Sequence, residues 1–413
     1  MLTLHSKQLI YIFTILLSSN LYSQLVDFTI HLLQNKKEPF WLISNNDGLY
    51  TNSSVVSFKV AEKLTTYNYG IEAVILQSQI DKQFLNQAYF SVNNNNIYFQ
   101  IGKKSNNLKF NNLSSGSFVE SSNSSPIPKF SFGTNNYKDM SFLNFKFQYL
   151  FKISHGWIYS PEYIKNPFLH EKSLSLKKEI SEKSHLVIAL DHMAIWAGET
   201  ILHGQQPSGI SDFFKVVFAR AGGKNSINQE QNNSLGNHLG AWTFLYKKKY
   251  KDKTLSLYLE HPFEDESGAR WILNEFDGLY GMHINRNKSF YISQFTYEYI
   301  NTMDQSGTHG ASDSTYGWDN YYNHYLYQSG WTHKGRIIGN PLFTLGSNDG
   351  RYSNNQYIIN NRIKAHHIGF YGSLFDQLDY RILFTYSENF GIYPDKDYYK
   401  KIKKIYVFES GLV

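Results

Sequence analysis

Apolar and polar side chains alternate one by one through much of this chain, most clearly in the stretch Thr254–Ile284. In its first arm Leu255, Leu257 and Leu259 alternate with polar or aromatic neighbours. Successive side chains of a strand point to opposite faces, so a period of two predicts a strand with one apolar face. The arms flank a long charged loop, His261–Asp277, and short turns lie outside them. Strand, long loop, strand and short turn make up the repeat of an outer-membrane β-barrel.

The same period predicts further strands, and the lengths of the connections suggest on which side each one lies. The short turn Asn93–Asn96 suits the periplasmic side, and the Ser- and Asn-rich stretch Lys104–Ser125 suits an extracellular loop. Besides the hairpin arms, the predicted strands are Phe40–Ser44, Ser54–Lys63, Tyr67–Ser78, Phe84–Val92, Ile97–Lys103, Ile127–Gly133, Ser141–Ser154, Glu171–Lys178, His185–Trp196, Leu239–Lys249, Ser289–Ile300, two less regular strands within Tyr321–Thr344, Arg362–Gly372, Tyr380–Ser387 and Lys404–Ser410.

The stretch Ser141–Ser154 distinguishes a barrel from its soluble competitors. Its apolar positions include Phe147 and Phe151, and Lys152 and Gln148 lie among the alternate positions. A soluble β-sandwich or propeller would need a second sheet against so apolar a face. In a barrel that face meets lipid and the polar face lines a wet interior. The length of the stretch also suits a tilted membrane span and favours the barrel.

Strand parity makes a prediction about the region between Trp196 and Leu239. Successive barrel strands alternate in direction, and the strand Leu239–Lys249 ends in a short turn, so residues 197–238 must all lie outside the membrane. The stretch Ser211–Arg220 (SDFFKVVFAR) is therefore not a spanning strand. Its Ser-Asp start and helically spaced apolar residues predict a capped amphipathic helix that packs on or into the barrel mouth.

The N-terminus reads as an export signal. A lysine, an apolar core and small residues near Ser23 predict a signal peptide over 1–23, and no later run of 18 apolar residues predicts a spanning helix. Gln24–Lys37 is weakly periodic and suggests a helix within a periplasmic segment, 24–53, ahead of a barrel over 54–413. The predicted fold is an all-β membrane protein: an antiparallel outer-membrane β-barrel of about 16–18 strands with a short N-terminal periplasmic helical segment and long extracellular loops.

Composition narrows the possible functions further. The 413 residues include no cysteine, which excludes disulfides, thiolate metal sites and cysteine nucleophiles. Aromatics make up 17% of residues, yet mean hydropathy is −0.43, as expected when apolar residues are distributed over alternating strands. The formal charge of +6 is carried by scattered or turn lysines, so nucleic-acid binding is not expected. Nothing in the sequence calls for a cofactor or a metal.

The long loops hold the candidate binding residues. Aromatic rings stack on the apolar C–H face of a sugar, and planar polar groups form paired hydrogen bonds with neighbouring hydroxyls. The competing interpretation is an interfacial aromatic girdle with polar residues that fold the loops together. The stacking candidates are Trp271, Trp318, Tyr322 and Trp331, and the hydrogen-bonding candidates are Asp265, Arg270, Asp304, Asn323 and Arg336.

Catalytic alternatives receive less support. Glu264 and Asp265 could act as acid and base, but adjacent carboxylates in an acidic loop are usually solvated. The pairs Asp191-His192 and His366-His367 lie within predicted strands, so their members should point to opposite faces and not converge on one ion. HExxH, GxSxG, P-loop and GxGxxG motifs are all missing from the sequence. The sequence predicts a protein that is not an enzyme.

Several distinctive loop motifs extend over about 40–393 and read SSGSFVESSNSSPIPKFSFG, HGWIYSPEYIKNPFLHEK, DFFKVVFARAGG, LGNHLGAW, HPFEDESGARW, DGLYG, YEYINTMDQSG, YYNHYLYQSGWTHKGRIIGNPLF and NNRIKAHHIGFYG. Together these motifs resemble the capsule-assembly Wzi family of outer-membrane proteins, in its Bacteroidetes branch. The resemblance implies an 18-stranded barrel with a periplasmic helical part. It also implies a lectin in the cell outer membrane that ties capsular polysaccharide or exopolysaccharide to the cell and assists capsule assembly.

The resemblance has one departure near the C-terminus. Family members continue past the region matching SENFGIYPDKDYY and finish on an aromatic residue, whereas this chain ends at FESGLV. Either Phe40–Ser44 belongs to the barrel or the barrel does not close. Expected partners are the polysaccharide, outer-membrane lipid and lipopolysaccharide, and the outer-membrane insertion machinery, with the chain acting as a monomer. A porin for small solutes is the alternative function, and an outer-membrane hydrolase is a third.

Overall fold

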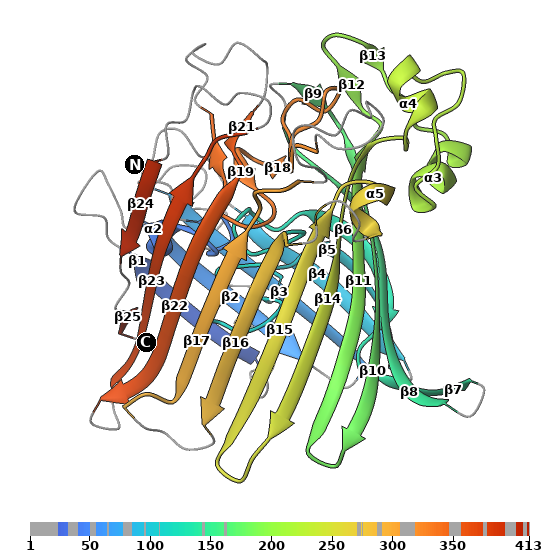
Figure 1. Ribbon diagram of the computed structural model, residues 1–413. Coiled ribbons are helices and arrows are strands. Elements are labelled where there is room, and N and C mark those ends of the chain that lie inside the picture. The colour runs from blue at the N-terminus through green and yellow to red at the C-terminus, as the bar shows by residue number, and fades with distance from the viewer. Residues whose placement is uncertain are drawn as a thin grey trace, which may run out of the picture.

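In the part of the chain that the structure describes, eighteen strands pair in one antiparallel sheet that curls round into a barrel (Figure 1). The computed structural model describes residues 24–31, 40–49, 55–63, 66–76, 85–94, 96–106, 108–142, 145–160, 163–270, 274, 276–286, 291–305, 319–346, 357–374, 378–392, 402–407 and 411–412. The strands of this sheet are β1 Gln24–His31, β2 Val55–Lys63, β3 Tyr67–Leu76, β4 Leu85–Asn94, β5 Ile97–Lys103, β6 Pro128–Thr134, β7 Lys138–Phe142, β8 Phe145–Trp157, β10 Phe168–Ser181, β11 Ser184–Trp196, β14 Asn237–Lys249, β15 Lys253–Phe263, β16 Gly278–Arg286, β17 Gln294–Asn301, β22 Ile363–Leu374, β23 Leu378–Asn389, β24 Ile402–Val407 and β25 Gly411–Leu412.

Short elements lie at the end of the barrel where the long loops are. They are α2 Phe40–Ile43, β9 Ile164–Lys165, β12 Glu199–Thr200, β13 Gly204–Gln205, α3 Ile210–Val217, α4 Asn228–Asn232, α5 Glu266–Ala269, β18 Thr332–His333, β19 Arg336–Ile337, β20 Thr344–Leu345 and β21 Ile358–Asn360. Among the described residues, no helix is long and apolar enough to cross a membrane.

The strands follow one another round the barrel almost in sequence order. Strands β1 to β6 pair in sequence order, each with its neighbour in this series, and β6 pairs with β8. From β8 the strands continue round the barrel in the order β10, β11, β14, β15, β16, β17, β22, β23 and β24. β7 and β6 both pair with β8, and β25 and β24 both pair with β23, so the eighteen strands fill sixteen positions. This agrees with the predicted 16–18 strands. Within the described residues, no backbone pairing joins β1 to β24 or β25.

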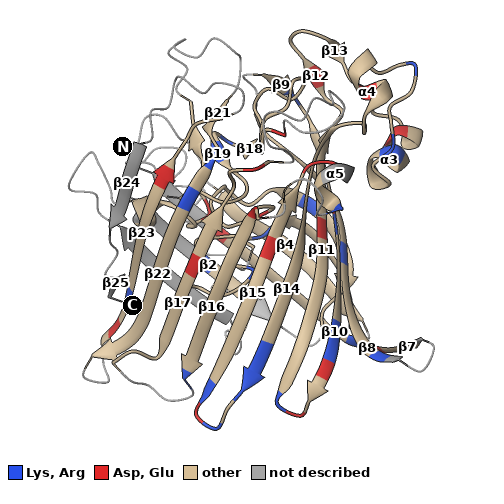
Figure 2. Ribbon diagram, viewed as in Figure 1, with Lys and Arg blue, Asp and Glu red and all other residues tan. Residues whose placement is uncertain are grey.

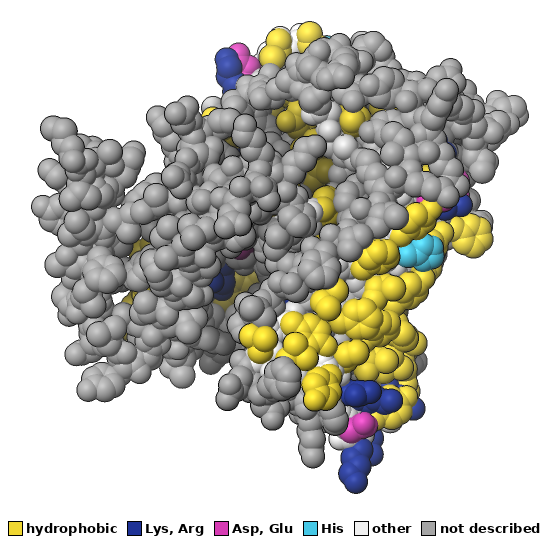
Figure 3. Space-filling view, turned by 90° about the vertical axis from the view of Figure 1, so that its left-hand side faces the viewer, with side chains coloured by type: hydrophobic (Ala, Val, Ile, Leu, Met, Phe, Trp, Pro, Cys, Tyr) yellow, Lys and Arg dark blue, Asp and Glu magenta, His cyan; other side chains and the backbone are white. Residues whose placement is uncertain are grey.

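The two faces of the wall differ as the alternation predicts. Exposed apolar side chains, among them Leu174, Leu186, Ile188 and Phe244, lie on the outer face of β10, β11 and β14. Figure 3, which views the molecule from the side of β23, also shows a broad apolar patch on its surface. Basic residues gather at the short turns between β10 and β11 and between β14 and β15 (Figure 2). Carboxylates such as Glu260 are instead fully buried inside the barrel. An apolar belt bounded by basic turns suits a lipid environment.

Several sequence predictions of local structure are wrong. Residues 24–31, expected to be helical, form β1, in which Val26, Phe28 and Ile30 alternate with other residues in a clean strand period. Phe40–Ser44, expected to be a strand, instead begins with the short helix α2. Only short strands occur within Tyr321–Thr344, and none of them belongs to the large sheet. The N-terminal segment therefore contributes a strand, β1, to the barrel.

One part of the parity prediction is confirmed: residues 197–236, between β11 and β14, contain no strand of the large sheet. Between β11 and β14 the chain forms only the short elements β12, β13, α3 and α4, which lie beyond the upper strand ends or beside them (Figure 1). The helix predicted at Ser211–Arg220 is α3, although its N-cap is Gly209 and not Ser211. The Asp212 carboxylate accepts a hydrogen bond from the Gly209 backbone N–H at 3.2 Å, which fixes the first turn.

Candidate functional site: the loop-filled mouth of the barrel

The segment 108–127, which we call the serine loop, folds into the barrel and not outward. Leu113, Ser115 and Phe118 have no solvent-exposed surface, and Ser121 to Ser125 are all buried. The sequence predicted a long extracellular loop between these strands, and the structure has a long loop between β5 and β6, but the loop turns into the barrel and is buried there. A serine-rich segment can be buried when its hydroxyl and backbone groups find partners, and the barrel wall supplies them.

Glu298 of β17 holds the start of the serine loop. Its side chain is completely buried and accepts hydrogen bonds from the Ser114 hydroxyl at 2.6 Å and from the Ser115 backbone N–H at 2.8 Å. The Ser115 hydroxyl donates to it at 2.6 Å and the Tyr258 hydroxyl at 2.7 Å. A buried carboxylate is tolerated only when it is charge-paired or well hydrogen-bonded. Four donors meet that requirement here.

Glu260 of β15 holds the next part of the loop in the same way. It accepts hydrogen bonds from the Ser117 hydroxyl at 2.5 Å, the Phe118 backbone N–H at 2.9 Å and the Lys109 ammonium at 2.9 Å. Lys109 also contacts Asp191 of β11 at 2.5 Å. Burial would lower the pKa of Lys109, but the two carboxylates outweigh it and raise that pKa above its ordinary value.

A third set of contacts fixes the end of the serine loop. Lys129 of β6 forms ion pairs with Glu120 of the loop at 2.5 Å and with Glu171 of β10 at 2.8 Å. Lys152 of β8 contacts Glu171 at 3.1 Å. Breaking a buried pair by removing one partner is strongly destabilising, because the other charge is left without compensation. The serine loop is therefore attached to the wall along its length.

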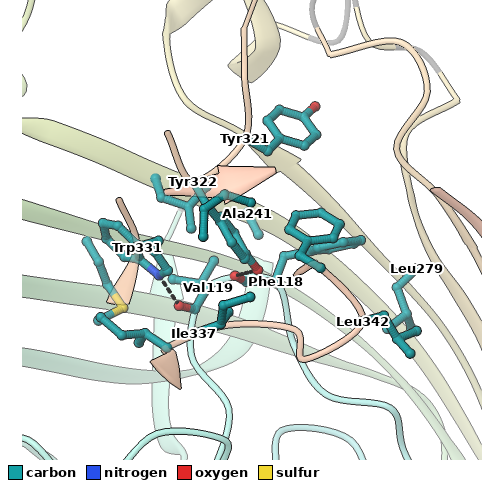
Figure 4. Packing of buried hydrophobic residues seen from close by; sticks show 14 of the residues in the cluster. Phe118, Val119, Ala241, Leu279, Tyr321, Tyr322, Trp331, Ile337 and Leu342 are labelled. Carbon is teal, nitrogen blue, oxygen red and sulfur yellow. Dashed lines mark hydrogen bonds between the residues drawn. The ribbon is translucent and has the colours of Figure 1, made fainter. Parts of the chain in front are cut away.

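A second segment, 319–346, which we call the aromatic loop, packs on the serine loop (Figure 4). The Trp331 indole N–H donates to the Val119 carbonyl at 2.8 Å, and the Tyr322 hydroxyl donates to the Phe118 carbonyl. The Asn340 side-chain amide donates to the Gly116 carbonyl at 2.7 Å. Together the two loops form one buried cluster with the inner face of the barrel wall.

The N-terminal helix α2 adds to this cluster beside β22 and β23. The Trp41 indole N–H donates to the Thr385 hydroxyl of β23 at 3.1 Å, and its ring lies 4.9 Å from the ring of His367. The Arg336 guanidinium of the aromatic loop donates to the Ile43 carbonyl at 2.9 Å. The mouth of the barrel is thus filled by three segments that lie far apart in the sequence.

Three predicted binding residues lie inside this cluster. Tyr322 and Trp331 are at most 1% exposed, so the expectation that these rings face solvent is wrong. Both rings are already hydrogen-bonded and packed, and they could meet a sugar only after leaving the cluster. Asn323 is also buried, because its side chain bridges to Asn320 and to the backbone of Ile358.

The other predicted residues lie nearer the surface. Asp265 is exposed and caps α5 by accepting from the Gly268 backbone N–H at 3.1 Å, and Arg270, just after α5, is also exposed. Asp304 is half-buried, and its backbone N–H donates to the buried carboxylate of Asp277 at 3.0 Å. Arg336 is half-buried against α2. Trp271 and Trp318 lie outside the described residues.

Buried carboxylates in these outer loops have raised pKa values. Burial raises the pKa of Asp277 to about 7, although the backbone N–H groups of Asp304 and Gln305 oppose it. Burial likewise raises the pKa of Glu230 to about 7 against hydrogen bonds from Gly236 and Tyr325. Both groups hold loops to one another, which explains their burial without any catalytic role.

Exposed tyrosines near the mouth were not singled out from the sequence. Tyr159 is 59% exposed, and its backbone joins it to the aromatic loop at His333 and Lys334. Tyr325 is 43% exposed, and its hydroxyl donates to Glu230 at 3.1 Å. The sequence around Tyr159, HGWIYSPEYIKNPF, is rich in aromatic residues. This concentration of aromatic residues is the sequence signal that could have identified Tyr159 as a candidate.

The paired residues within strands behave as predicted. Asp191 contacts Lys109 inside the barrel, whereas its neighbour His192 contacts His238 on the other face. Inside the barrel, the ring nitrogens of His367 are hydrogen-bonded to the Leu113 carbonyl and the Thr385 hydroxyl. His366 is instead hydrogen-bonded to the Tyr297 hydroxyl. Among the described residues, no group of three or more His, Asp or Glu side chains is placed to hold a metal ion.

The apolar outer belt, the alternating wall and the filled mouth define an outer-membrane β-barrel with its entrance occupied by its own loops. Residues 39–348 match the model of the family described as capsule assembly protein Wzi. The chain belongs to that family. No protein of curated function matches the sequence.

Solved structures with a similar fold include Wzi of Escherichia coli, an outer membrane protein involved in group 1 capsule assembly and a carbohydrate-binding β-barrel. It is 12% identical with a TM-score of 0.51, and the match covers 98% of this chain and 87% of that one. Pseudomonas aeruginosa OccK10 (OpdN) is 8% identical with a TM-score of 0.38, over 94% of this chain and 88% of that one. At that score the second likeness carries no argument about fold or function.

Proposed function

We propose that this protein is an outer-membrane lectin that binds capsular polysaccharide or exopolysaccharide and attaches it to the cell, assisting capsule assembly. The observation that carries the proposal is the filled mouth. The serine loop and the aromatic loop occupy the barrel entrance, and their charged and aromatic neighbours form the outward surface. Family membership and the carbohydrate binding of Escherichia coli Wzi support the same function.

Asp265 and Arg270 form the centre of the proposed contact surface. Both are exposed, and they lie at the two ends of the short helix α5, which fixes their backbones. A carboxylate accepts paired hydrogen bonds from neighbouring sugar hydroxyls, and a guanidinium donates paired hydrogen bonds to sugar hydroxyls or to the carboxylate of an acidic sugar. Trp271 and Trp318 remain proposed stacking residues, and exposed Tyr159 and Tyr325 join them. Asp304 and Arg336, both half-buried, are proposed to contribute at the edge of the surface.

The decisive experiment removes the gene and then restores it with variants. Loss of cell-attached polysaccharide, with free polysaccharide in the medium, is expected on deletion, and the unchanged gene should restore attachment. A variant carrying Asp265→Ala and Arg270→Ala should restore it poorly. Glu179→Ala, at the opposite end of the barrel, is the matched control and should restore it fully. Unchanged retention after deletion would overturn the proposal.

The porin alternative is tested with the purified protein. The loops that fill the mouth disfavour solute passage, so liposomes containing the protein should swell no faster in small sugars than empty liposomes. Binding on a glycan array should be retained in the same preparation. Rapid swelling together with no glycan binding would favour the porin instead.

We further propose that the protein is not an enzyme, that it acts as a monomer in lipid and lipopolysaccharide, and that the outer-membrane insertion machinery places it there. A hydrolase would degrade the polysaccharide that it binds. An unchanged size distribution of bound polysaccharide after prolonged incubation is the expected result. Shortening that disappears in an Asp265/Asp304 double variant would instead assign catalysis to those carboxylates.

A further inference from the structure

Helix α3 lies against the outside of the barrel wall. On β10, Leu174 and Leu176 are 47% and 40% exposed on the outer face, and the period of two places His170 on that face as well. Yet His170 has no exposed surface, and neither has Ala194 on the neighbouring strand β11. Something therefore covers the upper outer wall at these strands. The covering element is α3 with its flanking loop.

Contacts across this interface confirm the position of the helix. The Phe213 ring of α3 lies 5.6 Å from His170 and 5.9 Å from Trp196 of β11, measured between ring centroids. Val216 of α3 is completely buried in a cluster with Trp196 and Ala194. The Lys172 ammonium of β10 donates to the Val217 carbonyl in the last turn of α3. A cation at the C-terminal end of a helix also favours its dipole.

A second apolar face of the same helix, which we call the open stripe, is exposed to solvent. Ile210 and Phe214 of α3 and Phe218 just after it recur every four residues, and they are 75%, 52% and 65% exposed. This open stripe is next to the wall-facing residues on the helix surface, whereas Ser211 and Lys215 lie on the remaining side. Apolar residues therefore occupy more than half of the helix circumference. The barrel wall covers only part of them.

We propose that α3 is an interfacial helix whose open stripe inserts into the lipid of the outer leaflet beside the barrel. The apolar belt on the outer face of β10 and β11 lies along the same strands below the helix, so the stripe continues a surface that already meets lipid. The stripe exposes roughly 400 Å² of mainly apolar surface, the size of the largest apolar patches on soluble monomers, which are often interaction sites. An amphipathic helix at a membrane interface has this arrangement.

The charges at the end of α3 agree with a lipid occupant. Arg220 and Lys224 are exposed just beyond the stripe, where they can approach the phosphate groups of the lipid headgroups. Lys215 pairs with Asp212 on the helix itself at 2.9 Å, so it stays on the polar side. Apolar side chains next to exposed cations are typical of a helix that lies in the plane of a membrane surface.

Because the sequence has no cysteine, a single introduced thiol can carry a spin label without first removing any native thiol. Phe214→Cys and Phe218→Cys test the stripe, Ser211→Cys on the polar side is the matched control, and Leu176→Cys marks the lipid-facing belt. The full-length protein is reconstituted into vesicles of phosphatidylethanolamine and phosphatidylglycerol containing lipopolysaccharide. Collisions with oxygen report lipid, and collisions with a water-soluble nickel chelate report water.

The expected ratio of oxygen to nickel collisions at 214 and 218 is close to that of Leu176→Cys and at least tenfold higher than that of Ser211→Cys. Equal ratios at 211, 214 and 218 would overturn the proposal. Labels at 214 and 218 that are protected from both reagents, in a protein that chemical cross-linking shows to be a dimer, would assign the stripe to a second copy and also overturn it.

Discussion

Glu298 should decide whether the serine loop stays inside the barrel. Its carboxylate accepts four hydrogen bonds, two at each oxygen, and one donor is the rigid backbone N–H of Ser115. In Glu298→Gln the amide oxygen can take the place that faces Ser115, and the amide NH₂ can donate to the Ser114 and Tyr258 hydroxyls, which are free to rotate. That substitution should cost about 1 kcal/mol through the loss of charge.

Glu298→Ala removes all four bonds and leaves the Ser115 N–H without a partner in a buried site. An unsatisfied buried donor costs about 1–3 kcal/mol, and the lost charge-assisted bonds add to this, so the serine loop should be destabilised by about 3 kcal/mol. Every 1.4 kcal/mol is a factor of ten in an equilibrium constant. The fraction of molecules with the loop open should therefore rise roughly a hundredfold.

A thiol at Val119 can measure this opening. Val119 is 3% exposed and lies in the serine loop, and Val119→Cys would be the only thiol in the chain. Its labelling by a bulky maleimide should be about a hundred times faster with Glu298→Ala and no more than about ten times faster with Glu298→Gln. Glu179→Ala, a half-exposed position at a short turn, is the control and should leave the rate unchanged. Equal rates for all variants would refute the reasoning.

Two further predictions concern the loops around the mouth. Trp331→Phe should lower the free energy of unfolding by about 1 kcal/mol, because the hydrogen bond from the indole to Val119 is lost. Trp331→Ala also leaves a cavity and should lower it by about 3–5 kcal/mol. Loss of the heat-modifiable folded band on gels measures both effects, and no difference between the two variants would contradict the packing argument. The raised pKa of Glu230, about 7, means that its contribution to packing of the loop 197–236 is complete below its unfolded pKa near 4.5 and is lost as the pH rises through 7. Hydrogen exchange in that loop, corrected for intrinsic rates, should therefore quicken over this range in the native protein and stay level in Glu230→Gln; parallel profiles would count against it.

The sequence predicts the wall well, because each strand carries its own evidence. The period of two is local, and the outer and inner faces differ so sharply in polarity that β5, β11 and β14 were placed within two residues. The lack of a spanning strand over residues 197–236 followed from strand parity alone. One failure lies where a short strand period, at 26–30, is part of the longer and weakly periodic stretch Gln24–Lys37. Another lies where a short apolar stretch such as Phe40–Ile43 fits helix and strand equally.

The binding residues were harder to predict, because loop chemistry does not show which side of a loop faces water. Trp331 and Tyr322 have the aromatic and polar character of sugar-binding residues, but the same character suits a buried ring with one hydrogen bond. Asp265 and Arg270 are exposed, as their charge suggests, and lie at the two ends of α5. Only the contacts between loops that are distant in sequence distinguish the buried candidates from the exposed ones.

The wall nevertheless carried a sign that the serine loop lies inside. In β15 and β17, Glu260 and Glu298 occupy inward positions near the strand ends with no lysine or arginine opposite them on the paired strand. An inward carboxylate must be hydrated or receive donors from another segment. Serine hydroxyls and the backbone N–H groups of a turn-rich loop are such donors, and the serine loop is dense in both. Carboxylates on the inner wall and serines in a neighbouring loop are thus complementary features, and read together they indicate a filled mouth.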